Sequence, residues 1–269
     1  MRIRFKLAAP LLALAAIATP ASAHRIWLLP SGTVFSGQDQ WVTVDAAVSN
    51  DLFYFEHRPM QLDNLTVTAP DGSKATAQNQ SKGEYRSTFD VKLDKPGTYK
   101  IELLNQGVFA SYKLDGEQKR WRGKPEEIAG KIPANATDVR VTQQQGRLET
   151  FVTSGKPSDT VLKPTGVGLE LVPVTHPNNL VSGEKASFRL VLDGQPAAGV
   201  DVEVIPGGVR YRDKLNEMKV TTDESGTFSV TWPQPGMYWV NASVQDAKAT
   251  IANAQRRASY TTTLEVLPQ

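Results

Sequence analysis

The chain has 269 residues, 30 Lys and Arg against 28 Asp and Glu, and no cysteine. With 40% hydrophobic and 22% charged residues it has an ordinary globular composition, which excludes a disordered chain and a multi-span membrane protein. The lack of cysteine excludes disulfides, thiolate zinc sites, iron–sulfur clusters and a cysteine nucleophile. The small net charge of +2 gives no indication of a nucleic-acid partner.

We expect residues 1–23 to be a signal peptide that is removed on export. Three basic residues precede an apolar run over 7–18, and Ala-Ser-Ala at 21–23 supplies the small side chains that a signal peptidase reads. Cleavage removes three positive charges and leaves 246 residues with a net charge of −1, beginning at His24. The apolar run is too short to span a bilayer comfortably, so we expect no membrane insertion after cleavage.

Most of the chain after residue 23 shows the alternation of apolar and polar residues that is typical of half-buried strands. The clearest examples are residues 42–48, 65–68, 99–103, 186–192, 200–204 and 228–230. Asp193-Gly194 directly after one of these runs is a hairpin signal. Helical periodicity is scarce, with one short turn of helix predicted to begin at Pro125. The sequence therefore predicts a mainly β protein.

A repeated motif predicts two domains. Residues 95–99 and 234–238 both contain a Pro-Gly turn, one further residue and then a Tyr that enters a strand. Such a turn commonly leads into one of the last strands of a β-sandwich, so two copies predict two tandem Ig-like β-sandwiches.

The polar stretch over residues 104–165 is too long for a plain loop in a compact domain. We expect it to extend the first sandwich irregularly, with additional strands at 139–142 and 148–152. The predicted domains are 24–165 and 166–269.

Several segments carry a resemblance to a known family: Gly168-Leu169-Glu170-Leu171-Val172-Pro173, Asp193-Gly194-Gln195-Pro196, residues 222–228 and residues 235–239. Together with Trp27-Leu28 shortly after the cleavage site, they resemble an exported bacterial family of uncharacterised function. Its members are often labelled periplasmic components of nickel or cobalt uptake systems. The resemblance implies a periplasmic location, the handling of a transition metal and a membrane metal transporter as partner. The second half also resembles transthyretin-like or carboxypeptidase-regulatory sandwiches, in which Asp-x-x-Gly-x-Phe joins two strands.

The three histidines are the main candidates for a metal site. After cleavage, His24 offers both its α-amine and its ring to one divalent ion of nickel, cobalt or copper, and His57 is the most favoured second ligand. Three nitrogens suit Cu(II) or Ni(II) and resemble a copper histidine brace. The reserve candidates are His176, Asp45, Asp51 and Glu56. The alternative interpretations are a frayed terminal residue for His24, a hydrogen-bonded strand-end residue for His57 and a turn residue for His176.

No motif calls for catalysis, so we predict no enzyme activity, no catalytic residue and no organic cofactor. The basic run over residues 119–124 is interpreted as a solvated loop, with an acidic polymer or membrane headgroups as the alternative ligand. The arginines at 207–213 and 256–257 are interpreted as surface residues. The second hypothesis for function is an envelope adhesion or scaffold module that binds protein or glycan through exposed aromatic residues and arginines. The sequence sets neither the metal nor the oligomeric state.

Overall fold

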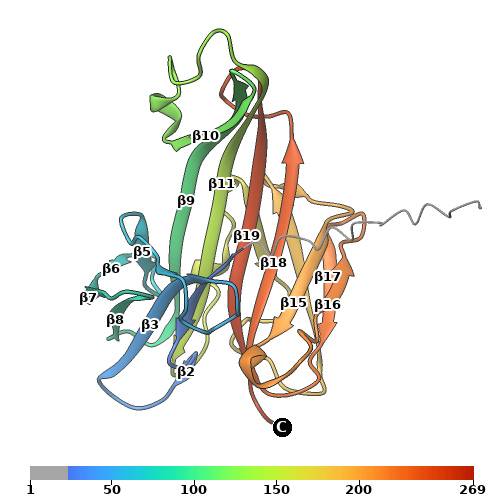
Figure 1. The fold of residues 1–269 in the computed structure, drawn as a ribbon. Helices are drawn as coiled ribbons and strands as arrows, with labels where there is room; N and C mark the ends of the chain where they lie inside the picture. The colour runs from blue at the N-terminus through green and yellow to red at the C-terminus, as the bar shows by residue number, and fades with distance from the viewer. Residues whose placement is uncertain (1–23) are drawn as a thin grey trace, which may run out of the picture.

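The computed structural model describes residues 24–269, which form nineteen strands and three short 3-10 helices arranged in three sheets (Figure 1). The predicted signal peptide, residues 1–23, lies outside the described residues. The prediction of a mainly β protein built from sandwiches is confirmed. The described part of the chain includes no helix that is long and apolar enough to cross a membrane.

The first sandwich is formed by a five-stranded sheet and part of a larger one. The five strands are β1 (Arg25–Pro30), β3 (Gln40–Ser49), β4 (Arg58–Pro59), β7 (Ala77–Lys82) and β8 (Ser87–Leu93). The core between this sheet and the larger one includes Leu28, Val44, Phe89 and Ile101, which are fully buried.

The second sandwich repeats this arrangement with a four-stranded sheet. Its strands are β12 (Leu169–Pro173), β13 (Lys185–Leu192), β14 (Gln195–Pro196) and β17 (Thr227–Thr231). The core beneath it includes Phe188, Val204, Trp232 and Tyr260. Asp193 and Gly194 both have positive φ, 52° and 77°, so the predicted hairpin turn joins β13 to β14.

A single ten-stranded sheet supplies the other layer of both sandwiches. Its strands are β2 (Val34–Phe35), β5 (Leu65–Thr68), β6 (Lys74–Ala75), β9 (Gly97–Leu114), β10 (Glu117–Gly123), β11 (Thr137–Ser154), β15 (Asp201–Pro206), β16 (Met218–Thr221), β18 (Gly236–Asp246) and β19 (Ala254–Val266). The sheet becomes continuous where β11 pairs with β19 in parallel, from Val141–Ala254 to Thr150–Thr263. The two halves of the chain thus share one layer, and the expected boundary at residue 165 falls in the loop after the 3-10 helix Thr160–Leu162.

A third apolar cluster fills the space between the two sandwiches. The first half of the chain contributes Trp27, Ala47 and Leu52 to this cluster, and the second half contributes residues that include Ile205 and Trp239. The indole Nε1 of Trp239 also donates a hydrogen bond of 2.9 Å to the backbone oxygen of Ile26. Packing and hydrogen bonding therefore join the two halves in addition to the shared sheet.

The repeated Pro-Gly-x-Tyr motif has the same structural role in both sandwiches. The Tyr99 hydroxyl donates to the Lys95 carbonyl at 3.1 Å, and the Tyr238 hydroxyl donates to the Gln234 carbonyl at 2.7 Å. Both tyrosines are fully buried, and burial raises the pKa of Tyr99 to about 12, so its hydroxyl remains a donor. Each tyrosine fastens its strand to the turn that precedes it, as the tyrosine corner of Ig-like domains does.

The polar stretch after residue 104 forms an arm that rises beyond the sandwiches, at the top of Figure 1. β9 and β11 are each 18 residues long, and β10 pairs with the far end of β9. The two short strands expected at 139–142 and 148–152 are parts of the single strand β11. The predicted helical turn at Pro125 is confirmed as the 3-10 helix Pro125–Glu127. The basic run 119–124, interpreted as a loop, lies mostly in β10.

Candidate functional site

His24 and His57 lie against each other although 33 positions separate them in the sequence. His24 immediately precedes β1 and His57 immediately precedes β4, and both of these strands pair with β3. Ile26 and Arg58 are both opposite Val48, so the two strands start at the same end of β3, one on each side of it. The imidazole centroids are 4.0 Å apart and the ring planes differ by 17°. Both histidines are exposed.

The stacked pair provides two imidazoles for a common ligand. Metal–nitrogen bonds are about 2.0–2.1 Å long, so the rings have to turn their lone pairs toward one ion, which the exposure of both side chains allows. No group of three or more His, Asp or Glu side chains within residues 24–269 could hold a metal ion together.

The three reserve carboxylates lie apart from such a group. The Asp45 carboxylate is 3.4 Å from the guanidinium of Arg86, and burial raises its pKa despite this cation. Glu56 Oε1 accepts a hydrogen bond of 3.1 Å from the backbone N–H of Asp51, within the loop that leads to His57. This bond fixes the loop, so Glu56 and Asp51 have a role in positioning His57.

His176 is half-buried at the junction of the two sandwiches. Its Nδ1 accepts a hydrogen bond of 3.1 Å from the backbone N–H of Asn178, and its Nε2 is 3.1 Å from the Thr98 hydroxyl. Because Nδ1 is an acceptor, the ring is held neutral with its proton on Nε2. Burial is the main cause that lowers the pKa of His176. The structure does not bring this residue into a group with His24 and His57, and both ring nitrogens already have partners.

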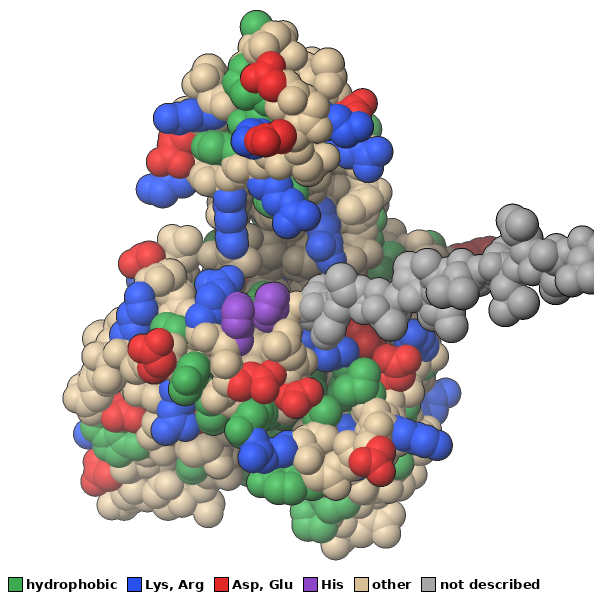
Figure 2. Space-filling model, viewed as in Figure 1, with side chains coloured by type: hydrophobic (Ala, Val, Ile, Leu, Met, Phe, Trp, Pro, Cys, Tyr) green, Lys and Arg blue, Asp and Glu red, His purple; other side chains and the backbone are tan. Residues whose placement is uncertain are grey.

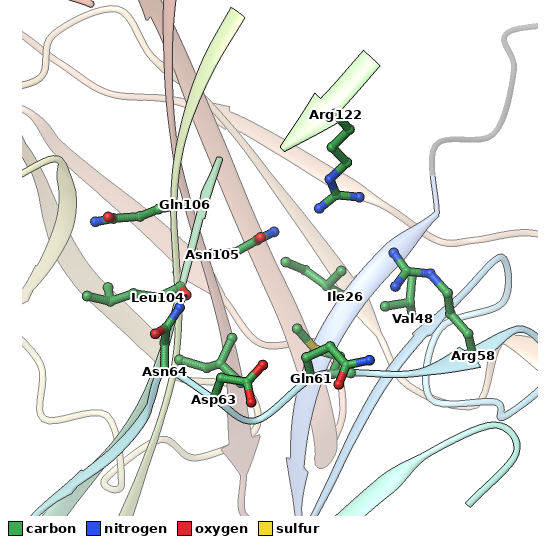
Figure 3. Close-up of a pocket in the computed structure, with 12 residues that line it drawn as sticks. Ile26, Val48, Arg58, Gln61, Asp63, Asn64, Leu104, Asn105, Gln106 and Arg122 are labelled. Carbon is green, nitrogen blue, oxygen red and sulfur yellow. Dashed lines mark hydrogen bonds between the residues drawn. The ribbon is translucent and has the colours of Figure 1, made fainter. Parts of the chain in front are cut away.

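Figure 2 shows a hollow between the arm and the body of the molecule, with histidine side chains on its lower rim. The hollow consists of three adjoining cavities of about 130, 270 and 520 Å³. Arg122 and Asn105 line the first two, and Phe109 lines the second and third. In Figure 3, Arg122 from β10 and Arg58 from β4 reach into the first cavity from opposite sides. Lys and Arg side chains are gathered around the hollow in Figure 2.

The arginines of the hollow come from alternate positions of adjacent strands. Arg120 and Arg140 both flank Ser111 of β9, Arg122 is opposite Phe109, and Arg257 is opposite Gln144. Paired residues of neighbouring strands share a face of the sheet. We call Arg58, Arg120, Arg122, Arg140 and Arg257 the arginine hollow. The sequence analysis missed it, and the available signal was the alternation within residues 119–124.

Neighbouring arginines that face elsewhere have structural roles. Arg256, adjacent to Arg257 but on the opposite face, is buried and forms ion pairs with Asp193 at 2.8 Å and with Asp246. The interpretation of Arg256 as a surface residue is therefore wrong. Arg212 donates to four backbone carbonyls around η3 (Val209–Tyr211), including that of Leu215 at 2.8 Å, so it fixes its own loop.

A buried charge network lies in the shared sheet between the sandwiches. Arg147 pairs with Glu102, is 3.5 Å from Glu149 and 3.6 Å from Glu170. Glu149 also accepts a hydrogen bond of 2.9 Å from the Tyr260 hydroxyl. Burial raises the pKa of Glu149 to about 7 in spite of the nearby cations. The network connects β9, β11, β12 and β19, and it stabilises the junction of the two halves.

Comparison with known proteins gives a family. The family model described as "Domain of unknown function (DUF4198)" matches residues 21–246. No curated protein matches the chain. Among solved structures, the D0-D1 domain of intimin has 14% identity and a TM-score of 0.24, covering 89% of this chain and 97% of that chain. The FN1-FN3 domains of chicken CNTN1 have 11% identity and a TM-score of 0.23, covering 90% and 98%.

Proposed function

The chain belongs to the DUF4198 family, and we propose that it is an exported, periplasmic protein that binds a divalent transition-metal ion, nickel, cobalt or copper, at its mature N-terminus. The observation that carries the proposal is the stacked pair of His24 and His57, whose ring centroids are 4.0 Å apart. In this proposal the ligands are the His24 α-amine and ring together with the His57 ring. The function is capture without catalysis, followed by delivery to a membrane metal transporter.

The fold supports this site because it fixes the positions of both histidines from the same strand. Ser49 and Val48 at the end of β3 pair with β1 on one side, and Val48 pairs with β4 on the other. The backbone next to each histidine is therefore held by a strand ladder, while the two exposed rings can still turn. A site with held backbone and adjustable side chains needs little reorganisation to close around an ion.

The test is isothermal titration of the chain that starts at His24 with Ni(II), Co(II) and Cu(II). We expect binding at a ratio of one to one, with an affinity that falls as the pH falls, because protons compete for the ring and amine nitrogens. One extra residue before His24 converts the amine into an amide and should weaken binding about a hundredfold or more, through loss of the chelate. His57→Gln should also weaken binding.

The matched control is one extra residue after Gln269, which adds the same mass and leaves the His24 amine free. It should bind as the unextended chain does. Equal binding by the N-terminally extended chain, or by His57→Gln, would contradict the proposed ligand set. No binding of any of the three metals by the chain that starts at His24 would contradict the function itself.

A further inference from the structure

We propose that the arginine hollow binds an acidic polysaccharide chain, a ligand distinct from the metal proposed above. Positive charge is in excess on the walls of the hollow. Five arginines line the three adjoining cavities, and the carboxylates in the same walls are Asp63 and Asp138. Asp138 is already engaged by Lys113 at 2.7 Å.

The arginines of the hollow have no partners within the described part of the chain. None of the five side chains forms an ion pair or a side-chain hydrogen bond there, whereas Arg147 and Arg256 elsewhere in the same sheet are fully paired. Like charges held on one face repel one another, and an anion relieves that repulsion. The mature chain as a whole has a net charge of only −1, so this gathering of cations is local.

The spacing of the cations favours an extended chain over one small anion. Neighbouring strands are about 4.8 Å apart, so Arg120 and Arg140, on either side of β9, have backbones separated by about 10 Å. Successive same-face positions along a strand are about 7 Å apart, which places Arg122 and then Arg257 in the next two rows. No single phosphate or carboxylate reaches all of them, but a polymer with a regularly repeated acid group does.

The rest of the wall favours a sugar chain. Phe109 is 37% exposed at the centre of the face and presents an apolar ring, which the CH face of a sugar can cover. Asn105 and Gln144 provide amides that can donate to and accept from hydroxyl groups. Single-stranded nucleic acid is recognised by several aromatic side chains in succession, and this face offers one. A membrane surface does not reach the recessed wall that Figure 2 shows.

The experiment is isothermal titration of the chain starting at His24 with a hexamer of α-1,4-linked galacturonate, in metal-free buffer. We expect binding that weakens with added salt, because exposed charges are screened. Arg120→Gln with Arg122→Gln should weaken it about tenfold or more, since two charge-assisted contacts are lost. The matched control is Lys119→Gln with Arg189→Gln, which removes the same charge from the opposite face of β10 and from β13, and it should bind as the unmodified chain does.

Two further arms identify the ligand. Neutral maltohexaose should not bind, and Phe109→Ala should weaken binding of the galacturonate hexamer while circular dichroism shows the fold unchanged. Inorganic polyphosphate bound as tightly as the hexamer, with no effect of Phe109→Ala, would overturn the proposal in favour of a general anion-binding surface. Unchanged binding in the double arginine variant would overturn it as well. Because no metal is present, these outcomes are independent of those at His24 and His57.

Discussion

The cluster between the sandwiches should control the stability of the whole molecule, and Ile205→Ala is the change that tests this. Ile205 is fully buried and packs among Trp27, Leu52 and Trp239, which come from both halves of the chain. Truncation to Ala removes three carbon atoms, a loss of about 2.4 kcal/mol at about 0.8 kcal/mol per buried methylene. The cavity that remains adds to this, so we expect a total of about 3–4 kcal/mol, within the range for Ile→Ala in cores.

The melting temperature should fall by roughly 6–16 °C, since about 1 kcal/mol corresponds to about 2–4 °C in a chain of this size. Differential scanning calorimetry should show one transition before and after the substitution, because the parallel pairing of β11 with β19 joins the two cores. Ile251→Ala, in the loop between β18 and β19, is the matched control and should cost much less because Ile251 is only half-buried. Two resolved transitions, of which only one shifts in Ile205→Ala, would refute the reasoning.

Two pH-dependent predictions concern buried titratable groups. Burial raises the pKa of Glu149 to about 7, so its ionisation opposes folding as the pH rises above its ordinary value of 4.5. From pH 5 to pH 8 the free energy of unfolding should therefore fall by about 1–3 kcal/mol relative to Glu149→Gln, and parallel urea-denaturation profiles of the two proteins would rule this out. The lowered pKa of His176 acts in the opposite direction, because protonation destabilises the fold as the pH falls below 6.5. Between pH 7 and pH 5 the chain should lose stability relative to His176→Asn, as measured by melting temperature, and an equal slope for both would contradict it.

The strands were predictable from the sequence wherever one face of the strand is buried and the other is exposed to solvent. Val42, Val44 and Ala46 are fully buried and alternate with the more exposed residues 41, 43 and 45. This pattern predicts both the strand and the face that it turns toward the core. The repeated tyrosine motif was predictable for a related reason, since its turn, its tyrosine and its strand are all local in sequence. Each of these signals depends only on neighbouring residues.

The shared sheet and the site were not predictable in this way. Alternation shows which face a residue is on and does not show which strand lies beside it, so the pairing of Gln144 with Arg257 left no mark in the sequence. The polar residues 143–145 also resemble a loop, because the arm has less core to bury there. His24 and His57 meet only because the register of β3 brings their flanking strands together. The sequence could nominate both histidines but could not place them in contact.

The parallel pairing of β11 with β19 also affects how prone the chain is to aggregate while it is being synthesised. β19 begins at Ala254, a hundred residues after the end of β11 at Ser154, so it is synthesised well after β11. Until it arrives, β11 presents ten residues of unpaired backbone along one edge. Such an edge is a template for strands of other molecules. β19 therefore protects the half of the protein that is made first. A chain that stops before residue 254 retains the residues of its first core but leaves the edge of β11 open to strands of other molecules.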